Sequence, residues 1–198
     1  MTSATLRDLV ESTALTLECG LYRATQFDDG CFILKPGDVA NKRYPERPIP
    51  SRQMGGPIAR RGDVAINLDF RPGRAVAIGE MLDGAEPTKG VALARVSGSP
   101  EVDGGYLRAW LLCGELERQL QPRHRGSTMT YVKLADLLDT VIPIPKLHLQ
   151  RDLAERFESA RVEVLIATRY LGEAREVLEL ESMYLVVKAT EEAQRTGQ

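Results

Sequence analysis

The chain has few of the residues on which most catalytic and metal sites depend. Its 198 residues include three cysteines and two histidines. Cys19, Cys31 and Cys113 lie far apart, so their spacing forms neither a disulfide framework nor a zinc-binding cluster. Neither His124 nor His148 has a second histidine four residues away or a cysteine at ligand spacing. We therefore predict reduced cysteines, no metal site and no cofactor.

Catalytic sequence motifs are missing as well. There is no G-x-S-x-G turn, no G-x-x-x-x-G-K-[ST] phosphate loop and no glycine fingerprint for a dinucleotide or methyl-donor cofactor. Residues 67–70 (NLDF) are superficially similar to the Asn-Pro-Pro-aromatic motif of amino-methyltransferases, but both prolines are absent and the residues fit a strand better. No catalytic residue is predicted, and a small stand-alone enzyme is the least favoured class.

Long apolar runs are also lacking. No stretch approaches the roughly 20 residues that span a bilayer, and the first residues lack the charged-then-apolar pattern of a signal peptide. The hydrophobic and charged fractions, 43% and 27%, are typical of soluble globular proteins. The sequence predicts a cytoplasmic protein that does not bind membranes, with one domain and an appended element.

Charge is distributed unevenly along the chain, although the net charge is only −2. Between residues 41 and 74, eight basic residues stand against three acidic ones, whereas residues 151–181 carry eight acids and five arginines. A local basic region can bind a polyanion despite an acidic average. A mixed, solvated surface is the alternative that charge alone leaves open.

Short elements of both kinds are predicted in the first 148 residues. Alternation over residues 63–70 predicts a half-buried strand whose outer face carries Ala65, Asn67 and Asp69. Further strands are expected at 31–35, 75–79, 91–96 and 141–144, helices at 4–10, 103–121 and 132–139, a turn at 36–38 and an irregular loop at 41–57. The predicted fold class is α/β (α+β), with a small twisted β-sheet and short helices.

A regular apolar spacing follows the two prolines at 143 and 145. Apolar residues alternate four and three apart, as in the seam of a coiled coil, and we assign these positions to helix pairing: Leu153, Phe157, Ala160, Val164, Ala167, Leu171, Ala174 and Leu178. A helix from 151 to 187 would be about 55 Å long. We predict a long coiled-coil-type helix over 149–190 that pairs with a second helix, then a disordered tail at 191–198. A helix that packs only on its own domain is the alternative.

Arginines in and beside the loops are the candidate recognition residues. The planar guanidinium makes two parallel hydrogen bonds to a phosphate or a guanine edge, and loops commonly carry recognition residues. The predicted DNA-binding residues are Arg43, Arg47, Arg52, Arg60, Arg61, Arg71, Arg74, Arg123 and Arg125.

Five stretches in order resemble one known family. They are LKPGDVAN (34–41), ARRGDVAINLDFRPGRAVAI (59–78), GGYLRAWLLCGELERQL (104–120), RGST (125–128) and LADLLDTVIPIPKLHLQRDLAERF (134–157). The last is the most specific, because a short strand, prolines, a leucine and Gln150 lead into a long helix. Together they resemble the specificity subunit of type I restriction–modification systems, with residues 1–148 as its DNA target-recognition domain.

The resemblance implies a non-catalytic protein that recognises double-stranded DNA. Family members usually carry two recognition domains and two spacer helices, and this chain has one of each, as a half-subunit would. Implied partners are a methyltransferase (modification) subunit, a restriction or translocase subunit, and a second copy of the chain or another specificity-like protein. The alternative is an interaction or inhibitory module that pairs with such subunits without binding DNA.

Overall fold

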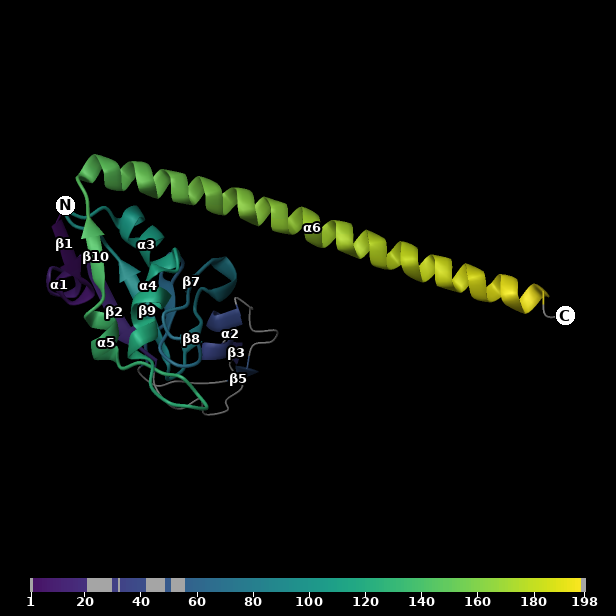
Figure 1. Cartoon of the computed structure of the whole chain (residues 1–198), viewed down its shortest axis with the longest axis horizontal. Coiled ribbons are helices and arrows are strands. Elements are labelled where there is room, and N and C mark those ends of the chain that lie inside the picture. Colours follow the sequence, from purple (N-terminus) through teal and green to yellow (C-terminus); the bar gives the residue numbers. More distant parts are fainter. Residues whose placement is uncertain (1, 21–29, 32, 42–48, 51–55, 197–198) are drawn as a thin grey trace. The chain divides into compact units, whose positions relative to one another are not determined.

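A computed structural model gives the structure of the chain (Figure 1). It describes the backbone of residues 2–20, 30–31, 33–41, 49–50 and 56–196, and the side chains of residues 2–20, 33–41 and 56–172. The predicted fold class is confirmed: a small antiparallel sheet and short helices precede a long helix.

The central sheet has four strands in the order β2-β9-β6-β7, and every neighbouring pair is antiparallel. Its members are β2 (Leu15–Cys19), β6 (Val64–Asn67), β7 (Ala75–Ala77) and β9 (Val91–Val96). Both faces of this sheet are covered. Val64 and Ile66 of β6 pack in one apolar cluster with α1, α3 and α4, whereas Ala65 packs in a second cluster with Leu34 and Ile78.

Burial on both faces corrects the prediction of a half-buried strand at 63–70. All four residues of β6 are buried, including the polar Asn67. Alternation misled here because Ala65 is small enough to fit beneath a second layer, and because Asn67 has hydrogen-bond partners in the interior. Its side-chain amide donates to the carbonyl oxygens of Pro36 and Phe70, both at 2.8 Å.

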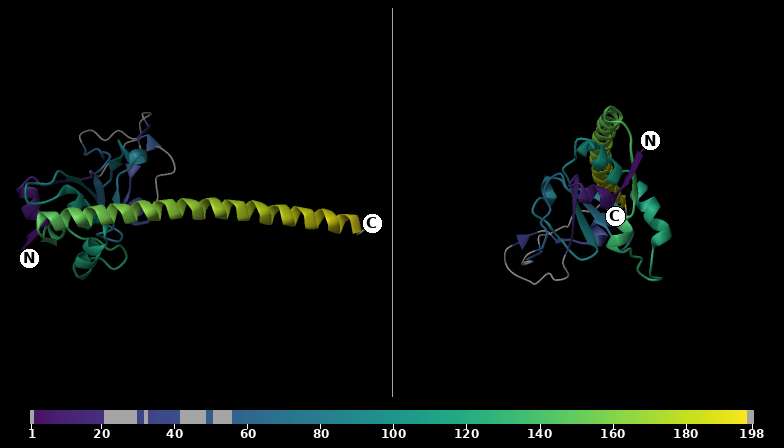
Figure 2. Two further views of the ribbon diagram at one scale, coloured as in Figure 1. Left: turned by 90° about the horizontal axis from the view of Figure 1, so that it is seen from above. Right: turned by 90° about the vertical axis from the view of Figure 1, so that its left-hand side faces the viewer.

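Smaller strands pair outside this sheet. β1 (Thr2–Thr5) is antiparallel to β10 (Val141–Ile144), with Thr2 opposite Ile144 and Thr5 opposite Val141. The two lie side by side next to the first turn of α6 in each view (Figures 1 and 2), where Thr2 and Leu147 line a common groove. Strand β10 was predicted, whereas β1 was not. The remaining pairs are β3 (Gly30–Cys31) with β5 (Ile49–Pro50), and β4 (Ile33–Leu34) with β8 (Glu86–Pro87).

Short helices cover the sheet. They are α1 (Leu6–Glu11), α2 (Pro36–Asn41), α3 (Gly104–Leu112), α4 (Glu115–Leu120) and α5 (Leu134–Leu138), with 3₁₀ turns η1 (Glu80–Leu82) and η2 (Gln121–Arg123). The predicted helix at 103–121 is divided, because Gly114 adopts a left-handed φ of 89° between α3 and α4.

Helix α2 occupies the place of the turn predicted at 36–38. Pro36 suits a first helical position because it has no N–H to leave unpaired. The Asp38 carboxylate accepts the backbone N–H of Lys35 at 2.9 Å, which satisfies a donor at the helix start. The sequence PGD therefore begins a helix here. The predicted irregular loop at 41–57 lies largely outside the described residues.

The long helix α6 spans Leu147–Thr196. It begins two residues before position 149, the start predicted from the sequence. Contacts divide the chain into one compact unit at Met1–Glu155 and a second at Arg156–Gln198. The first nine residues of α6 therefore belong to the globular unit, and the rest is a helical unit. In the described part of the chain, no helix is both long and apolar enough to cross a bilayer.

Candidate nucleic-acid interface

The predicted arginines fall into three groups. Arg43, Arg47 and Arg52 lie outside the described residues. Arg60, Arg61 and Arg71 are exposed, and within the described part of the chain their side chains form no hydrogen bond or ion pair. The others, Arg74, Arg123 and Arg125, bond within the domain.

Arg74 links three elements of the domain. Its Nε donates to the Glu117 carboxylate at 3.3 Å, and its Nη1 donates to the carbonyl oxygen of Ala40 at 3.2 Å. Glu117 belongs to α4 and Ala40 to α2. The turn before Arg74 lies close against α4, because a Cβ on Gly73 would stand 2.6 Å from the Cα of Glu117. Arg74 therefore helps to hold this turn in place.

Arg123 and Arg125 both bond to Asp136. The Arg123 guanidinium donates to the backbone carbonyl of Asp136 at 2.7 Å. Arg125 donates to both carboxylate oxygens of Asp136, forming a forked ion pair. The carboxylate also accepts the backbone N–H of Lys133 at 2.8 Å. The Arg125 hydrogen bond is the main reason that the pKa of Asp136 is lowered. This ion pair connects the 123–131 loop to α5.

A strained turn presents Arg71 next to an exposed aromatic residue. Phe70 and Arg71 have φ values of 50° and 66°, a left-handed conformation that non-glycine residues seldom adopt and that often marks functional sites. The turn is held from both sides, since the Phe70 N–H donates to Thr130 O and its carbonyl accepts the Asn67 amide, both at 2.8 Å. The side chain of Phe70 is 46% exposed.

The loop that holds Phe70 adds exposed apolar side chains. Tyr131 and Met129 are 42% and 65% exposed, and Tyr131 forms isolated backbone bridges with Asp69 and Arg125. Asp69, Lys89, Met129 and Tyr131 line a cleft of about 410 Å³. Phe70, Met129 and Tyr131 were not predicted from the sequence as recognition residues. For Phe70 the available signal was its position directly before Arg71, and aromatic side chains are common anchors of recognition surfaces.

A second cleft gathers arginines at the other end of β6. Its volume is about 350 Å³. Its lining residues are Arg60, Arg61, Gly62, Asp63, Arg95, Val96, Gly104, Gly105 and Arg108. Arg95 forms a forked pair with the buried Asp63, at 2.8 and 3.0 Å, and this hydrogen bond is the main reason that the pKa of Arg95 is raised. Arg95 and Arg108 are absent from the predicted set, because they lie within a strand and a helix rather than in loops.

The predicted pairing positions of α6 are accessible where side chains are described. Val164 and Leu171 are 65% and 72% exposed. Leu153, Ala160 and Ala167 are exposed too, and Phe157 is half-buried. The side chains of Ala174 and Leu178 lie outside the described set. Exposed apolar residues also occur away from the predicted seam, at Val162, Leu165, Ile166 and Tyr170. An exposed helix that is apolar on more than one side is typical of a buried position in a larger assembly.

Within the described residues, no cluster of three or more histidine, cysteine, aspartate or glutamate side chains is placed to hold a metal ion. The two clefts include arginine, lysine and tyrosine side chains beside Asp63 and Asp69. The cationic side chains can bind phosphate oxygens and base edges.

Comparison with solved structures shows a shared fold. The HsdS subunit from Thermoanaerobacter tengcongensis matches with a TM-score of 0.58 and 17% identity, covering 85% of this chain and 39% of its own. The type I restriction–modification S subunit from M. genitalium matches with a TM-score of 0.58 and 12% identity, covering 84% and 41%. A chain from a structural study of the assembly and conformational transition of the type I restriction–modification system matches with a TM-score of 0.59 and 18% identity, covering 87% and 41%.

The fold is therefore that of type I specificity subunits, as the sequence resemblance predicted. The chain spans about two fifths of the length of these neighbours. No protein-family model matches the sequence, and no curated protein matches it either.

Proposed function

We propose that this chain is a non-catalytic DNA target-recognition protein that acts as a half-subunit of a type I restriction–modification or related methylation complex. The observation that carries the proposal is the shared fold with two S subunits over 84–85% of this chain. The arginines at 60, 61 and 71, which are exposed and have no side-chain partner within the described residues, add the chemistry that such a role requires.

Two surfaces of the globular unit have separate tasks in this proposal. The strained turn with Arg71 and Phe70 projects a cation and an aromatic ring, the side-chain types that contact base edges and thymine methyl groups in the major groove. The predicted loop arginines contribute phosphate contacts, which supply much of the affinity and make it fall with salt. Arg74, Arg123 and Arg125 contribute chiefly by fixing the loops, because their guanidinium groups already have partners.

The helical unit provides the docking surface. The seam with Val164 and Leu171 would pair with a second copy or with another specificity-like protein. The apolar side chains outside the seam, with Val162 and Ile166 among them, would receive a methyltransferase subunit, beside which a restriction or translocase subunit acts. Each apolar side of an exposed helix can be buried by a different partner, so apolar groups on two sides are consistent with two partners.

DNA binding by the purified chain tests the recognition role. Fluorescence anisotropy of a labelled pool of duplexes of mixed sequence, each about 30 base pairs long, would be followed at about 50 and 200 mM salt. If 6–10 phosphates are contacted, we expect the affinity to fall by roughly 10³–10⁵-fold between these conditions. Absence of binding at the lower salt would contradict DNA recognition by the chain alone. Capture of a type I methyltransferase subunit by the same non-binding protein would then favour the interaction-module alternative.

A further inference from the structure

We propose that the cleft between Arg60, Arg61 and Arg108 is a pocket for a phosphate group, which the backbone of the bound DNA supplies. The inference rests on the proposed function and deepens it by assigning a phosphate-binding task to a site at which Arg108 was not predicted. The cleft lies between the loop before β6, the end of β9 and the first turns of α3.

The charge of this cleft is unbalanced. Four arginines line it, and Asp63 is the carboxylate among its lining residues. The Asp63 carboxylate is engaged already, because it accepts two hydrogen bonds from Arg95 and a third, at 2.9 Å, from the backbone N–H of Arg60. Within the described residues, the side chains of Arg60, Arg61 and Arg108 have no anionic partner. Three of the four arginines therefore have no ion pair among the described residues.

The loop that carries two of these cations is fixed from its backbone. Arg60 donates its N–H to Asp63, and Arg61 donates its N–H to the Asp83 carboxylate at 2.9 Å. Gly62, which follows Arg61, takes a left-handed φ of 96°, a conformation that glycine adopts without strain. Because the backbone is held by these bonds, both guanidinium groups remain available to a ligand. Prior fixing of a loop lowers the entropy lost on binding.

Arg108 supplies a donor that lacks an acceptor. Its Nε is buried and, among the described residues, has no hydrogen-bond partner. A buried donor without a partner destabilises the fold. Because Arg108 also lines the cleft, a small shift of its guanidinium group toward a bound phosphate oxygen would supply the missing acceptor. Guanidinium groups grip phosphate oxygens in pairs. Several forks from a loop and a helix suit the tetrahedral oxygens of a phosphate better than one planar carboxylate.

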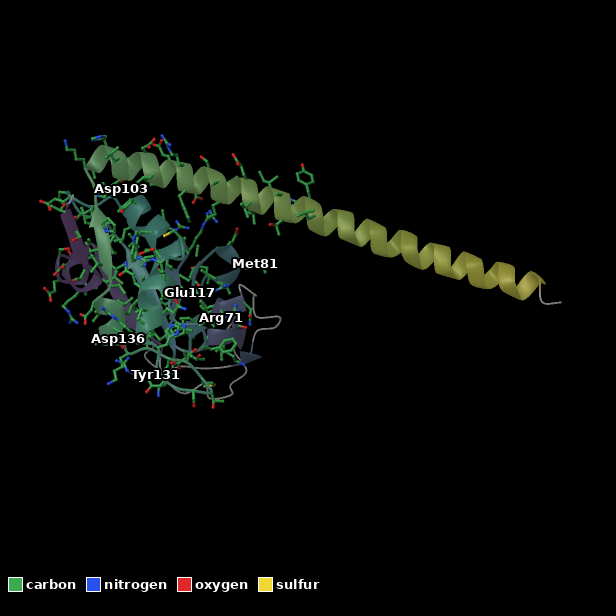
Figure 3. The ribbon with its side chains drawn as sticks, in the orientation of Figure 1. Arg71, Met81, Asp103, Glu117, Tyr131 and Asp136 are labelled. Carbon is green, nitrogen blue, oxygen red and sulfur yellow. The ribbon has the colours of Figure 1, made fainter. Side chains whose placement is uncertain are left out.

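The cleft and the strained turn lie at opposite ends of β6, which begins after Asp63 and ends before Phe70. In Figure 3, Asp103, which precedes α3, lies well above Arg71 of the strained turn. Anchoring and base reading would therefore use separate contact points. A phosphate anchor positions the protein on the duplex without carrying sequence information.

The test compares Arg108→Gln and Arg60→Gln with Arg118→Gln in the full chain. Arg118 is an exposed helical arginine on α4 that pairs with Glu115, so the control removes the same charge outside the cleft. DNA affinity would be measured by anisotropy across a salt series. Each cleft variant should weaken binding severalfold on all duplexes and reduce the slope of log affinity against log salt by about 1. The control should leave the slope unchanged, and Arg108→Lys should restore only part of it.

The outcomes separate this inference from the proposed function. If wild type binds DNA and both cleft variants match the control, the cleft proposal is wrong while DNA recognition stands. If wild type binds no DNA, recognition fails, and the pocket is tested with inorganic phosphate as a free ligand. A phosphate-induced rise in melting temperature that Arg108→Gln abolishes would support an anion pocket. Equal shifts in wild type and Arg108→Gln would overturn it.

Discussion

The side chain of Gln150 accepts the backbone N–H of Asp103 at 2.8 Å, across 47 residues of sequence. Its amide nitrogen donates to the carbonyl oxygens of Glu101 and Pro145, at 2.9 and 2.7 Å. The side chain is fully buried. One residue of α6 thus fixes the loop that begins α3, because Asp103 is also the N-cap of α3 and accepts the Tyr106 N–H at 3.0 Å.

Replacing Gln150 should therefore destabilise the globular unit. Gln150→Leu removes all three bonds, and each interior group left unpaired costs roughly 1–3 kcal/mol. Gln150→Glu keeps an acceptor for Asp103 but places a carboxylate against two carbonyl oxygens, so it should also be destabilising. Urea unfolding followed by the fluorescence of Trp110 measures both. Gln119→Leu is the matched control, because Gln119 exchanges two bonds with Val141 at a solvent-exposed edge. A loss no larger for Gln150→Leu than for the control would contradict this account.

Asn67→Leu should loosen the strained turn. The substitution leaves the carbonyl oxygens of Pro36 and Phe70 without their donor, at a cost of about 1–3 kcal/mol each if they remain buried. The left-handed conformation of Phe70 and Arg71 then loses one of its restraints. Limited chymotrypsin digestion should show faster cleavage after Phe70, relative to cleavage after Phe157 in α6. An unchanged cleavage ratio would indicate that the Thr130 bond alone maintains the turn.

Loss of Arg71 should affect DNA binding, whereas loss of Arg74 should affect the stability of the fold. Under the proposed function, Arg71→Ala lowers affinity for preferred duplexes with little change in stability, since the side chain is exposed and has no partner among the residues that the structure describes. A lost bidentate base contact corresponds to about 1–3 kcal/mol of discrimination. Arg74→Ala should instead lower the melting temperature, because it removes bonds to Glu117 and Ala40. Selection of bound duplexes from a random pool, with thermal unfolding of the same samples, checks both. Relaxed specificity in Arg74→Ala alone would reverse the assignment.

The Arg125–Asp136 pair should make stability depend on acid pH. The pKa of Asp136 lies below its ordinary value of 3.8, chiefly because Arg125 hydrogen-bonds the carboxylate. A lowered pKa in the folded state means that the pair stabilises the fold above the unfolded value and that this contribution is lost as pH falls through the folded value. The stability difference between wild type and Asp136→Asn should thus be constant above about pH 5 and shrink in more acidic solution. Asp139→Asn, at an exposed pair with Arg7, should change stability much less, because solvent screens an exposed ion pair.

Charges on the predicted seam of α6 should prevent pairing. Val164→Asp and Leu171→Asp would place a carboxylate at positions that the proposed second helix would bury, so assembly measured by light scattering should fall to that of a single chain. Val162→Asp is the matched control, because Val162 is exposed on the helix but lies outside the seam. Circular dichroism should show the globular unit folded in all three. Normal assembly of both seam variants would exclude pairing through this seam.

The sequence predicted those helices and strands whose patterns depend only on residues adjacent in the sequence. Strand β9 was predicted with its observed bounds, 91–96, because a run of apolar residues between turns needs no knowledge of its partner. Strand β1 was missed, since TSAT has little apolar character and its pairing with β10 depends on residues about 140 positions away. The same limit applied to Asn67, whose burial depends on carbonyl groups brought to it by α2 and the strained turn.

The candidate site was predicted in part for a similar reason. Charge and loop position identified Arg60, Arg61 and Arg71, which the structure leaves exposed. Charge and loop position could not distinguish these exposed arginines from Arg125, which is ion-paired in the structure. Its partner Asp136 is eleven residues further on and is brought to it by folding. Arg108 was hidden within a helix pattern, and only the packing of α3 beside the end of β9 brings it to the cleft. Sequence spacing shows which arginines could contact a ligand, whereas the tertiary structure decides which of them already have an ion-pair or hydrogen-bond partner within the domain.

The pairing of β1 with β10 has a consequence for how such a domain can be exchanged. Paired strands lie about 5 Å apart, and Thr2 faces Ile144 in the register. The first and last strands of the globular unit therefore stand side by side, and the chain between them begins and ends at nearly the same place. A different domain whose end strands pair in the same way could replace this one ahead of α6 without altering the residues of the helix from Arg156 onward.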